Sequence, residues 1–119
     1  MRLTAICVAL SLMAGCASAA LANDTYAAIA YSKDSGAYGY ANKYGSRRAA
    51  EERALQECGP GCSVVMWVRN ECAGLAVGRG RGYGTYRGEN ERIVGDAAIN
   101  ECERFTSSCE LKATVCSAW

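Results

Sequence analysis

Aromatic, β-branched and small residues occur on either side of a glycine-containing turn at two places in the chain. Such a pattern is typical of a β-hairpin. The two predicted hairpins are residues 26–31 and 37–41 around a turn at 33–36, and residues 73–77 and 83–86 around a turn at 78–82.

A helical spacing of apolar residues follows each hairpin. Ser46 is a good N-cap for a first helix over 47–58, and a second helix is predicted from about Asn90 to about Phe105. Each helix has one apolar stripe, formed by Ala50, Ala54, Leu55 and Cys58 in the first and by Val94, Ala98, Cys102 and Phe105 in the second. Gly95 lies inside the second helix, where glycine costs roughly 1 kcal/mol relative to alanine.

A strand is predicted after each helix, at 63–69 and at 110–116. The second strand has apolar residues on one face. The first has them on both faces, with Val64, Met66 and Val68 on one side and Val65 and Trp67 on the other. Because a strand that is apolar on both sides is usually buried on both, we expect residues 63–69 to be central in their sheet.

These elements predict an α+β fold built from a strand–strand–helix–strand unit used twice, in halves of about 23–72 and 73–119. Two arrangements are compatible with this pattern. Both helices can lie on one face of a single sheet, or two sheets can be related by a pseudo-two-fold axis. The sequence leaves this choice open.

Six cysteines follow residue 22, and six allow 15 disulfide pairings. The repeat makes them equivalent in pairs: Cys58 with Cys102, Cys62 with Cys109, and Cys72 with Cys116. A symmetric pattern is therefore favoured, and our hypothesis is Cys58–Cys62, Cys102–Cys109 and Cys72–Cys116. The first two would join each helix end to the next strand, and the third would join the two halves.

Two functional interpretations of the cysteines are weaker than the structural one. Cys58-Gly-Pro-Gly-Cys62 resembles a redox Cys-Gly-Pro-Cys motif, but it has one more residue between the sulfurs. It also follows a predicted helix C-terminus, whereas redox thiolates are stabilised at a helix N-terminus. A zinc site needs close pairs of thiolates, and Cys102 and Cys109 are too far apart in sequence. We therefore expect structural disulfides, no metal site and no cofactor.

The segment up to residue 22 is predicted to be a secretory leader. Arg2 supplies a positive start, and the apolar run 3–14 is shorter than the roughly 20 residues that span a bilayer. Ala20-Leu-Ala22 fits a signal-peptidase site. A competing interpretation takes Met13-Ala-Gly-Cys16 as a lipobox, which would make Cys16 a lipidated anchor of an outer-membrane lipoprotein. We favour a periplasmic or secreted protein, with membrane attachment only if Cys16 is lipidated.

The charge balance argues against nucleic acid as a partner. The chain has 13 Lys and Arg and 12 Asp and Glu, and it becomes neutral when Arg2 is removed with the leader. It has no histidine, the commonest general base and metal ligand. The Gly/Arg run 78–84 lacks the spacing of a phosphate-binding loop, and the chain has no serine-nucleophile motif. We therefore predict no catalytic residues and do not expect an enzyme.

Tyrosines concentrate on the hairpins and provide candidate binding residues. Tyr38 and Tyr40 share one strand face, and we expect them to pack on an opposing helix or strand rather than to bind a sugar or peptide. The second hairpin turn carries two arginines. Arg79, Arg81 and the adjacent Tyr83 are the predicted partner-binding residues, because an exposed cationic turn can contact an acidic partner.

Most of the chain after the leader resembles a known family. The residues that carry the resemblance are Tyr26-Ala-Ala-Ile-Ala-Tyr-Ser32, Gly36-Ala-Tyr-Gly-Tyr40, the helix 49–57 with Cys58 and Cys62, and Val64 to Asn70 with Cys72-Ala73. They are similar to the domain of unknown function 4189 family of small exported bacterial proteins. The resemblance implies an exported α+β domain. It implies no established enzymatic activity and no catalytic residues.

Export, disulfides and aromatic hairpins favour a non-enzymatic binding or interaction module of the cell envelope or extracellular space. Its partner would be a protein or an envelope polymer. Three alternatives stay open: an inhibitor or immunity protein, a small envelope hydrolase that uses helix carboxylates, and a redox protein built on Cys58 and Cys62.

Overall fold

The computed structural model describes residues 24–117, so the predicted leader and lipobox lie outside the described residues. The described chain forms six strands, two α-helices and one 3-10 turn. In order, these are β1 (Tyr26–Tyr31), β2 (Tyr38–Tyr44), α2 (Arg47–Cys58), β3 (Ser63–Arg69), β4 (Cys72–Val77), η2 (Arg79–Arg81), β5 (Tyr83–Gly88), α3 (Glu91–Cys102) and β6 (Glu110–Cys116).

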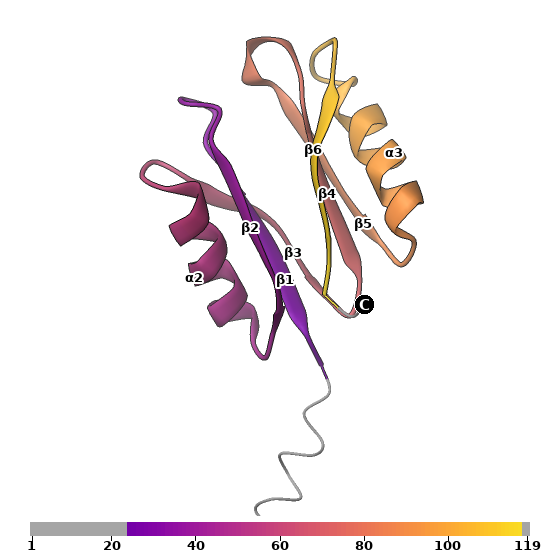
Figure 1. Ribbon diagram of the computed structural model, residues 1–119. Coiled ribbons are helices and arrows are strands. Elements are labelled where there is room, and N and C mark those ends of the chain that lie inside the picture. Colours follow the sequence, from indigo (N-terminus) through magenta and orange to yellow (C-terminus); the bar gives the residue numbers. More distant parts are fainter. Residues whose placement is uncertain (1–23, 118–119) are drawn as a thin grey trace, which may run out of the picture.

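The strands form two three-stranded antiparallel sheets. Sheet A has the order β2-β1-β3, and sheet B has the order β5-β4-β6. The inner faces of the sheets pack together, while α2 covers the outer face of sheet A and α3 that of sheet B (Figure 1). The α+β class is confirmed. Each half contains the strand–strand–helix–strand unit, and the halves form two separate sheets.

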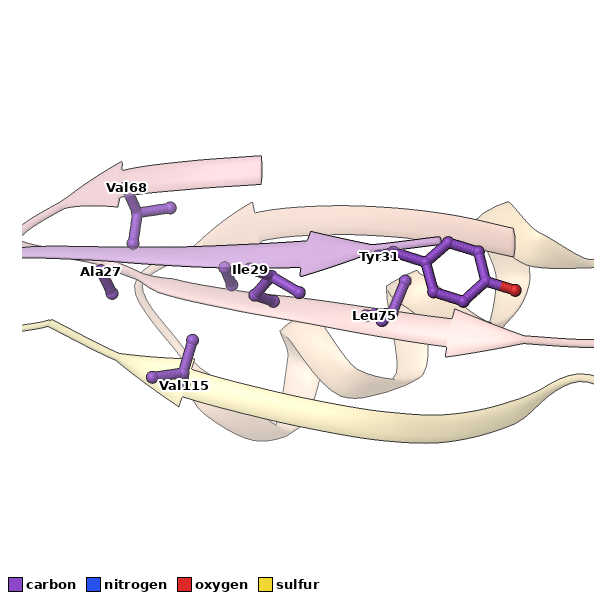
Figure 2. Packing of buried hydrophobic residues seen from close by; sticks show 7 residues of the cluster. Ala27, Ile29, Tyr31, Val68, Leu75 and Val115 are labelled. Atoms are coloured by element: carbon purple, nitrogen blue, oxygen red, sulfur yellow. The ribbon is translucent and has the colours of Figure 1, made fainter. Parts of the chain in front are cut away.

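The main core lies between the two sheets. Alternate residues of β1, namely Ala27, Ile29 and Tyr31, point toward sheet B and meet Leu75 and Val115 (Figure 2). Each of these three β1 side chains is almost completely buried. Because residues two apart on a strand face the same way, the remaining alanines of β1 face α2, so this strand is covered on both sides.

Small residues bring each helix close to its sheet. A Cβ atom added at Gly39 of β2 would lie 2.4 Å from the backbone nitrogen of Cys58, and one added at Gly84 of β5 would lie 2.2 Å from that of Cys102. The last turn of each helix thus rests directly on the strand backbone. Gly39 and Gly84 occupy equivalent positions in the two halves, and only glycine fits at either without movement of the helix.

Local hydrogen bonds set the helix boundaries. The Ser46 hydroxyl accepts a hydrogen bond from the Ala49 N–H at 3.1 Å, and the Asn90 side-chain oxygen accepts one from the Ile93 N–H at 3.0 Å. The predicted end of α3 at Phe105 is wrong, because the chain turns after Cys102 and the Phe105 N–H donates to the Cys102 carbonyl. Phe105 is therefore 68% exposed and does not belong to the apolar stripe.

The predicted central position of β3 is also wrong. β3 is an edge strand, and the central strands are β1 and β4. Its side chains are apolar on both faces because both faces are covered: Trp67 packs with α2, while Val65 and Met66 pack against the core between the sheets. Coverage of the two faces is independent of whether the strand edge is paired.

Residues 24–117 contain three disulfides, and they are the pairs that the symmetric pattern predicts: Cys58–Cys62, Cys72–Cys116 and Cys102–Cys109. One part of the prediction is wrong. Cys72–Cys116 joins β4 to β6 within sheet B, where the two residues are cross-strand partners, so it does not link the halves. In sheet A the corresponding strand positions are Tyr26 and Arg69. Cys72 and Cys116 are therefore not equivalent to each other in the repeat.

Neither helix within residues 24–117 has the length and apolar character needed to cross a membrane.

Candidate functional site

The two hairpin turns lie at the same end of the molecule (Figure 1), and Arg81 connects them. Its guanidinium donates a hydrogen bond to the Asp34 carbonyl in the first turn. Its own carbonyl accepts a hydrogen bond of 2.8 Å from the hydroxyl of Tyr31. Arg81 has a positive φ of 65°, which only a minority of non-glycine residues adopt. Its contacts are therefore largely within the molecule, although the side chain is exposed.

Arg79 is held by the loop that follows α3. The Arg79 N–H donates to the Ser107 carbonyl at 2.8 Å, and the Arg79 carbonyl accepts from the Thr106 hydroxyl at 2.6 Å. The guanidinium is exposed and makes one long contact, of 3.4 Å, with the Ser108 hydroxyl. This loop is closed by the Cys102–Cys109 disulfide, so the backbone of Arg79 is anchored to a cross-linked segment.

Tyr83 lies between two hollows at this end. Its ring is half-buried and its centroid is 5.0 Å from that of Tyr31. The first hollow, of about 430 Å³, is lined by Lys33, Gly82, Tyr83, Gly84, Thr85, Glu101 and Phe105. The second, of about 230 Å³, is lined by Tyr31, Ser32, Lys33, Asp34, Gly61, Ser63, Val65 and Tyr83. The structure thus brings the predicted residues Arg79, Arg81 and Tyr83 together with an exposed phenylalanine.

Tyr31 forms the floor of this region. It is 2% exposed, and its hydroxyl donates to the Arg81 carbonyl. Burial raises the pKa of Tyr31 above its usual value, because the low-dielectric surroundings disfavour the phenolate. The positive charge of Arg81 opposes this shift only partly. The buried phenol is therefore a neutral hydrogen-bond donor that holds the second turn in position.

Sequence patterns did not single out Lys33, Thr85, Glu101 or Phe105 as part of this region. The first three become neighbours only because the two turns meet at one end of the sandwich. Phe105 had a usable signal. Cys102 and Cys109 are seven positions apart, which in a continuous helix would separate their Cα atoms by about 10 Å, so a disulfide between them requires the helix to end between the two cysteines.

A third hollow, of about 410 Å³, runs between β2 and α2 and is lined by Tyr38, Gly39, Tyr40, Ala41, Asn42, Tyr44, Arg53 and Glu57. The prediction that Tyr38 and Tyr40 pack on another element is wrong, since they are 39% and 48% exposed. Tyr40 pairs with Ile29 on the inner face of sheet A, but β2 is an edge strand, so its side chains reach the rim of the core.

The Cys58–Cys62 disulfide lies at the end of α2, as the sequence predicts. Cys58 is the last residue of the helix and is buried, while Cys62 is partly exposed. Redox-active cysteines are accessible to their partners, so the burial of Cys58 favours a structural role. Across residues 24–117, the structure contains no group of three or more Cys, Asp and Glu side chains that could hold a metal ion.

The architecture agrees with the comparison to known families. The family model described as Domain of unknown function (DUF4189) matches residues 26–116, which contain both sheets, both helices and all three disulfides. No curated protein and no solved structure shows a significant match to the chain. Because the family model covers far more than half of the sequence, the resemblance found from the sequence is confirmed, and the chain belongs to the DUF4189 family.

Proposed function

We propose that the protein is a non-enzymatic binding module of the bacterial cell envelope or extracellular space, and that it binds its partner with the end of the molecule where the hairpin turns meet. The partner is a protein or an envelope polymer. Three disulfides in a small domain support an oxidising compartment, since such bonds do not persist in the reducing cytoplasm.

The exposed ring of Phe105 beside Tyr83 is the observation that carries this proposal. Phe105 is 68% exposed and borders a hollow of about 430 Å³ whose other walls include Tyr83, Lys33 and Glu101. Aromatic anchors next to a hollow, surrounded by a few charged groups, are the composition found at binding hot spots. The exposed guanidinium of Arg79 adds a residue type that is enriched at such sites.

The backbone of the turn end is already held by contacts within the free protein. The Cys102–Cys109 disulfide closes the loop that carries Phe105, and the Tyr31 hydroxyl and the Arg79 backbone bonds hold the second turn. A surface that is ordered in the free protein loses less conformational entropy on binding, which favours affinity. This rigidity supports a recognition role for the turn end.

The test is a capture experiment followed by affinity measurements. Immobilised protein is exposed to envelope extract, and the partner that it retains is purified and titrated against variants. Phe105→Ala and Arg79→Ala should each weaken binding by about tenfold or more, the range of a hot-spot residue. Ile93→Ala is the matched control, because Ile93 is also an exposed apolar residue, at 60%, but lies in the first turn of α3. Equal affinity for all variants would refute the proposed surface.

A further inference from the structure

The outer edge of β2 is unpaired in the described part of the chain, because sheet A has the order β2-β1-β3. An edge strand presents a row of free N–H and C=O groups that can pair with another strand. Six of the seven residues of β2 line the hollow that runs beside α2, together with Arg53 and Glu57 of the helix. The edge is therefore accessible along most of its length.

The edge strands of sheet B carry cations within the strand, whereas the cation of β2 lies near its end. β6 has Lys112, and β5 has Arg87, whose guanidinium also contacts the Trp67 carbonyl of β3 at 3.5 Å. Charged side chains on an edge hinder pairing with another chain. Residues 38–42 of β2 are uncharged, and Lys43 follows them with a positive φ of 64° at the end of the strand. β3, the other edge strand of sheet A, is uncharged up to Arg69, but the Arg87 guanidinium already occupies part of its edge. In β2 no side chain of another strand forms a hydrogen bond with the backbone of residues 38–42 within the described residues, so this edge is open to a partner strand.

The helix beside this edge carries a charge pair that suits a second copy of the chain. Arg53 and Glu57 form an ion pair of 2.5 Å between Nη2 and Oε2, with both side chains about half exposed. Gly39 lies against the last turn of α2. Tyr40 follows Gly39 in the strand, so it lies about 3.3 Å closer to the start of α2 than Gly39 does. This distance equals the rise of about two helix residues. Tyr40 is therefore level with the stretch of helix between Arg53 and Glu57.

We propose that two copies of this chain pair through their β2 edges, antiparallel about a two-fold axis close to Tyr40. The two A sheets then form one continuous six-stranded sheet. In this arrangement the Arg53 guanidinium of each copy faces the Glu57 carboxylate of the other. The two-fold axis therefore generates two pairs of opposite charges across the interface. An isologous contact of this kind is the commonest way in which identical chains associate.

Helix spacing is compatible with this dimer. α2 packs over β2 and β1, so its axis is about half a strand spacing inside the sheet edge. Two such helices across the axis would be about two strand spacings, or about 10 Å, apart. Packed helices in proteins are about 8–10 Å apart, so the two α2 helices meet side by side and antiparallel. The uncharged β2 edge and the charged helix flank thus fit the same partner.

Charge reversal combined with mixing tests this proposal. The exported, disulfide-bonded protein should sediment as a dimer at about 100 µM. The charged seam of the proposed dimer consists of residues 53 and 57 of both copies. Arg53→Glu makes this seam entirely acidic and Glu57→Arg makes it entirely basic, so each variant alone should dimerise at least about tenfold more weakly. An equimolar mixture of the two variants should restore the dimer as a mixed pair, which differential mass labelling identifies.

Mixing separates contacts between chains from contacts within a chain. Each variant lacks its own Arg53–Glu57 pair, and mixing cannot restore that pair within either chain. Loss of an exposed helical pair costs only about 0.3–0.5 kcal/mol, so both variants stay folded, and circular dichroism checks this. The matched control is Arg48→Glu mixed with Glu52→Arg, a similar pair that is 88% and 60% exposed on the outer side of α2. A monomeric wild-type protein, or a dimer that both reversals at the seam leave unchanged, would overturn the proposal.

Discussion

Replacing Gly39 with alanine is expected to destabilise the protein strongly, although it adds only one methyl group. The new Cβ would lie 2.4 Å from the Cys58 nitrogen, 2.7 Å from the Glu57 carbonyl carbon and 2.8 Å from the Ala54 oxygen. All three are backbone atoms of α2, so no side chain can rotate out of the way. Gly39 does not have a left-handed φ, so the effect comes from packing and not from backbone strain.

The loss of stability expected for Gly39→Ala follows from the need to move α2, whose C-terminal end is held in place. The Cys58–Cys62 disulfide and the buried alanines of α2 restrict such movement. Forcing an extra carbon into a close-packed contact typically costs about 1–3 kcal/mol, and a backbone contact belongs at the upper end of this range. A loss of about 2–3 kcal/mol would lower the melting temperature of a domain of this size by about 10–15 °C.

Chemical denaturation followed by circular dichroism measures this effect. The matched control is Gly45→Ala, because a Cβ at Gly45 meets nothing within 4 Å and the residue also lies next to α2. That variant should be as stable as the wild type or slightly more stable, since alanine restricts the unfolded chain by about 0.4–1 kcal/mol. If Gly39→Ala and Gly45→Ala unfold at the same denaturant concentration, the close helix-on-strand packing is not what stabilises this layer.

Three further predictions concern single features of the fold. Replacing Cys72 and Cys116 together with alanine should cost about 4 kcal/mol in unfolding free energy, because this bond closes a loop of 44 residues; denaturant unfolding measures it. Tyr31→Phe removes the donor to a turn carbonyl and should cost about 1–2 kcal/mol at neutral pH. Because burial raises the pKa of Tyr31, the wild type should also lose more stability than this variant above about pH 10, where the unfolded chain ionises first. Gly95→Ala should stabilise α3 by up to about 1 kcal/mol in the same assay, since the atoms nearest the new Cβ are side-chain ends, the movable end of Leu111 at 3.0 Å and the Thr114 methyl at an ordinary contact distance of 3.5 Å.

The sequence predicted the elements well where a periodic pattern coincided with a clear boundary residue. Ser46 and the cysteine at position 58 mark the limits of α2, and both later strands have the predicted bounds. The pairing of cysteines also followed from the repeat, because helix end and next strand must be adjacent in each unit. These features depend on residues that are close in sequence.

Features that depend on distant residues were not predictable in the same way. The pattern of apolar side chains along a strand indicates whether its two faces are covered, but not whether its two edges are paired. For this reason the apolar pattern of β3 wrongly predicted a central position in the sheet. The central strands β1 and β4 are rich in alanine because a helix packs closely on one side and a sheet on the other. The turn-end hollow depends on how the two sheets stack, which neither half encodes alone.

The two halves share a backbone plan but differ at the surfaces for which we propose functions. Glu57 and Glu101 each precede the last cysteine of their helix, but the position that holds Arg53 in α2 holds Ala97 in α3. The charge pair beside the edge strand therefore exists only in the first half, where we propose dimerisation. The exposed Phe105 and the turn arginines occur only in the second half, where we propose partner binding.

A dimer through β2 would then present two turn-end surfaces. If both attach to one polymer, the second contact forms at a high effective concentration and overall binding strengthens beyond that of a single site. The monomeric seam variants Arg53→Glu and Glu57→Arg should consequently bind an isolated partner unit as the wild type does, and bind a repeating polymer more weakly.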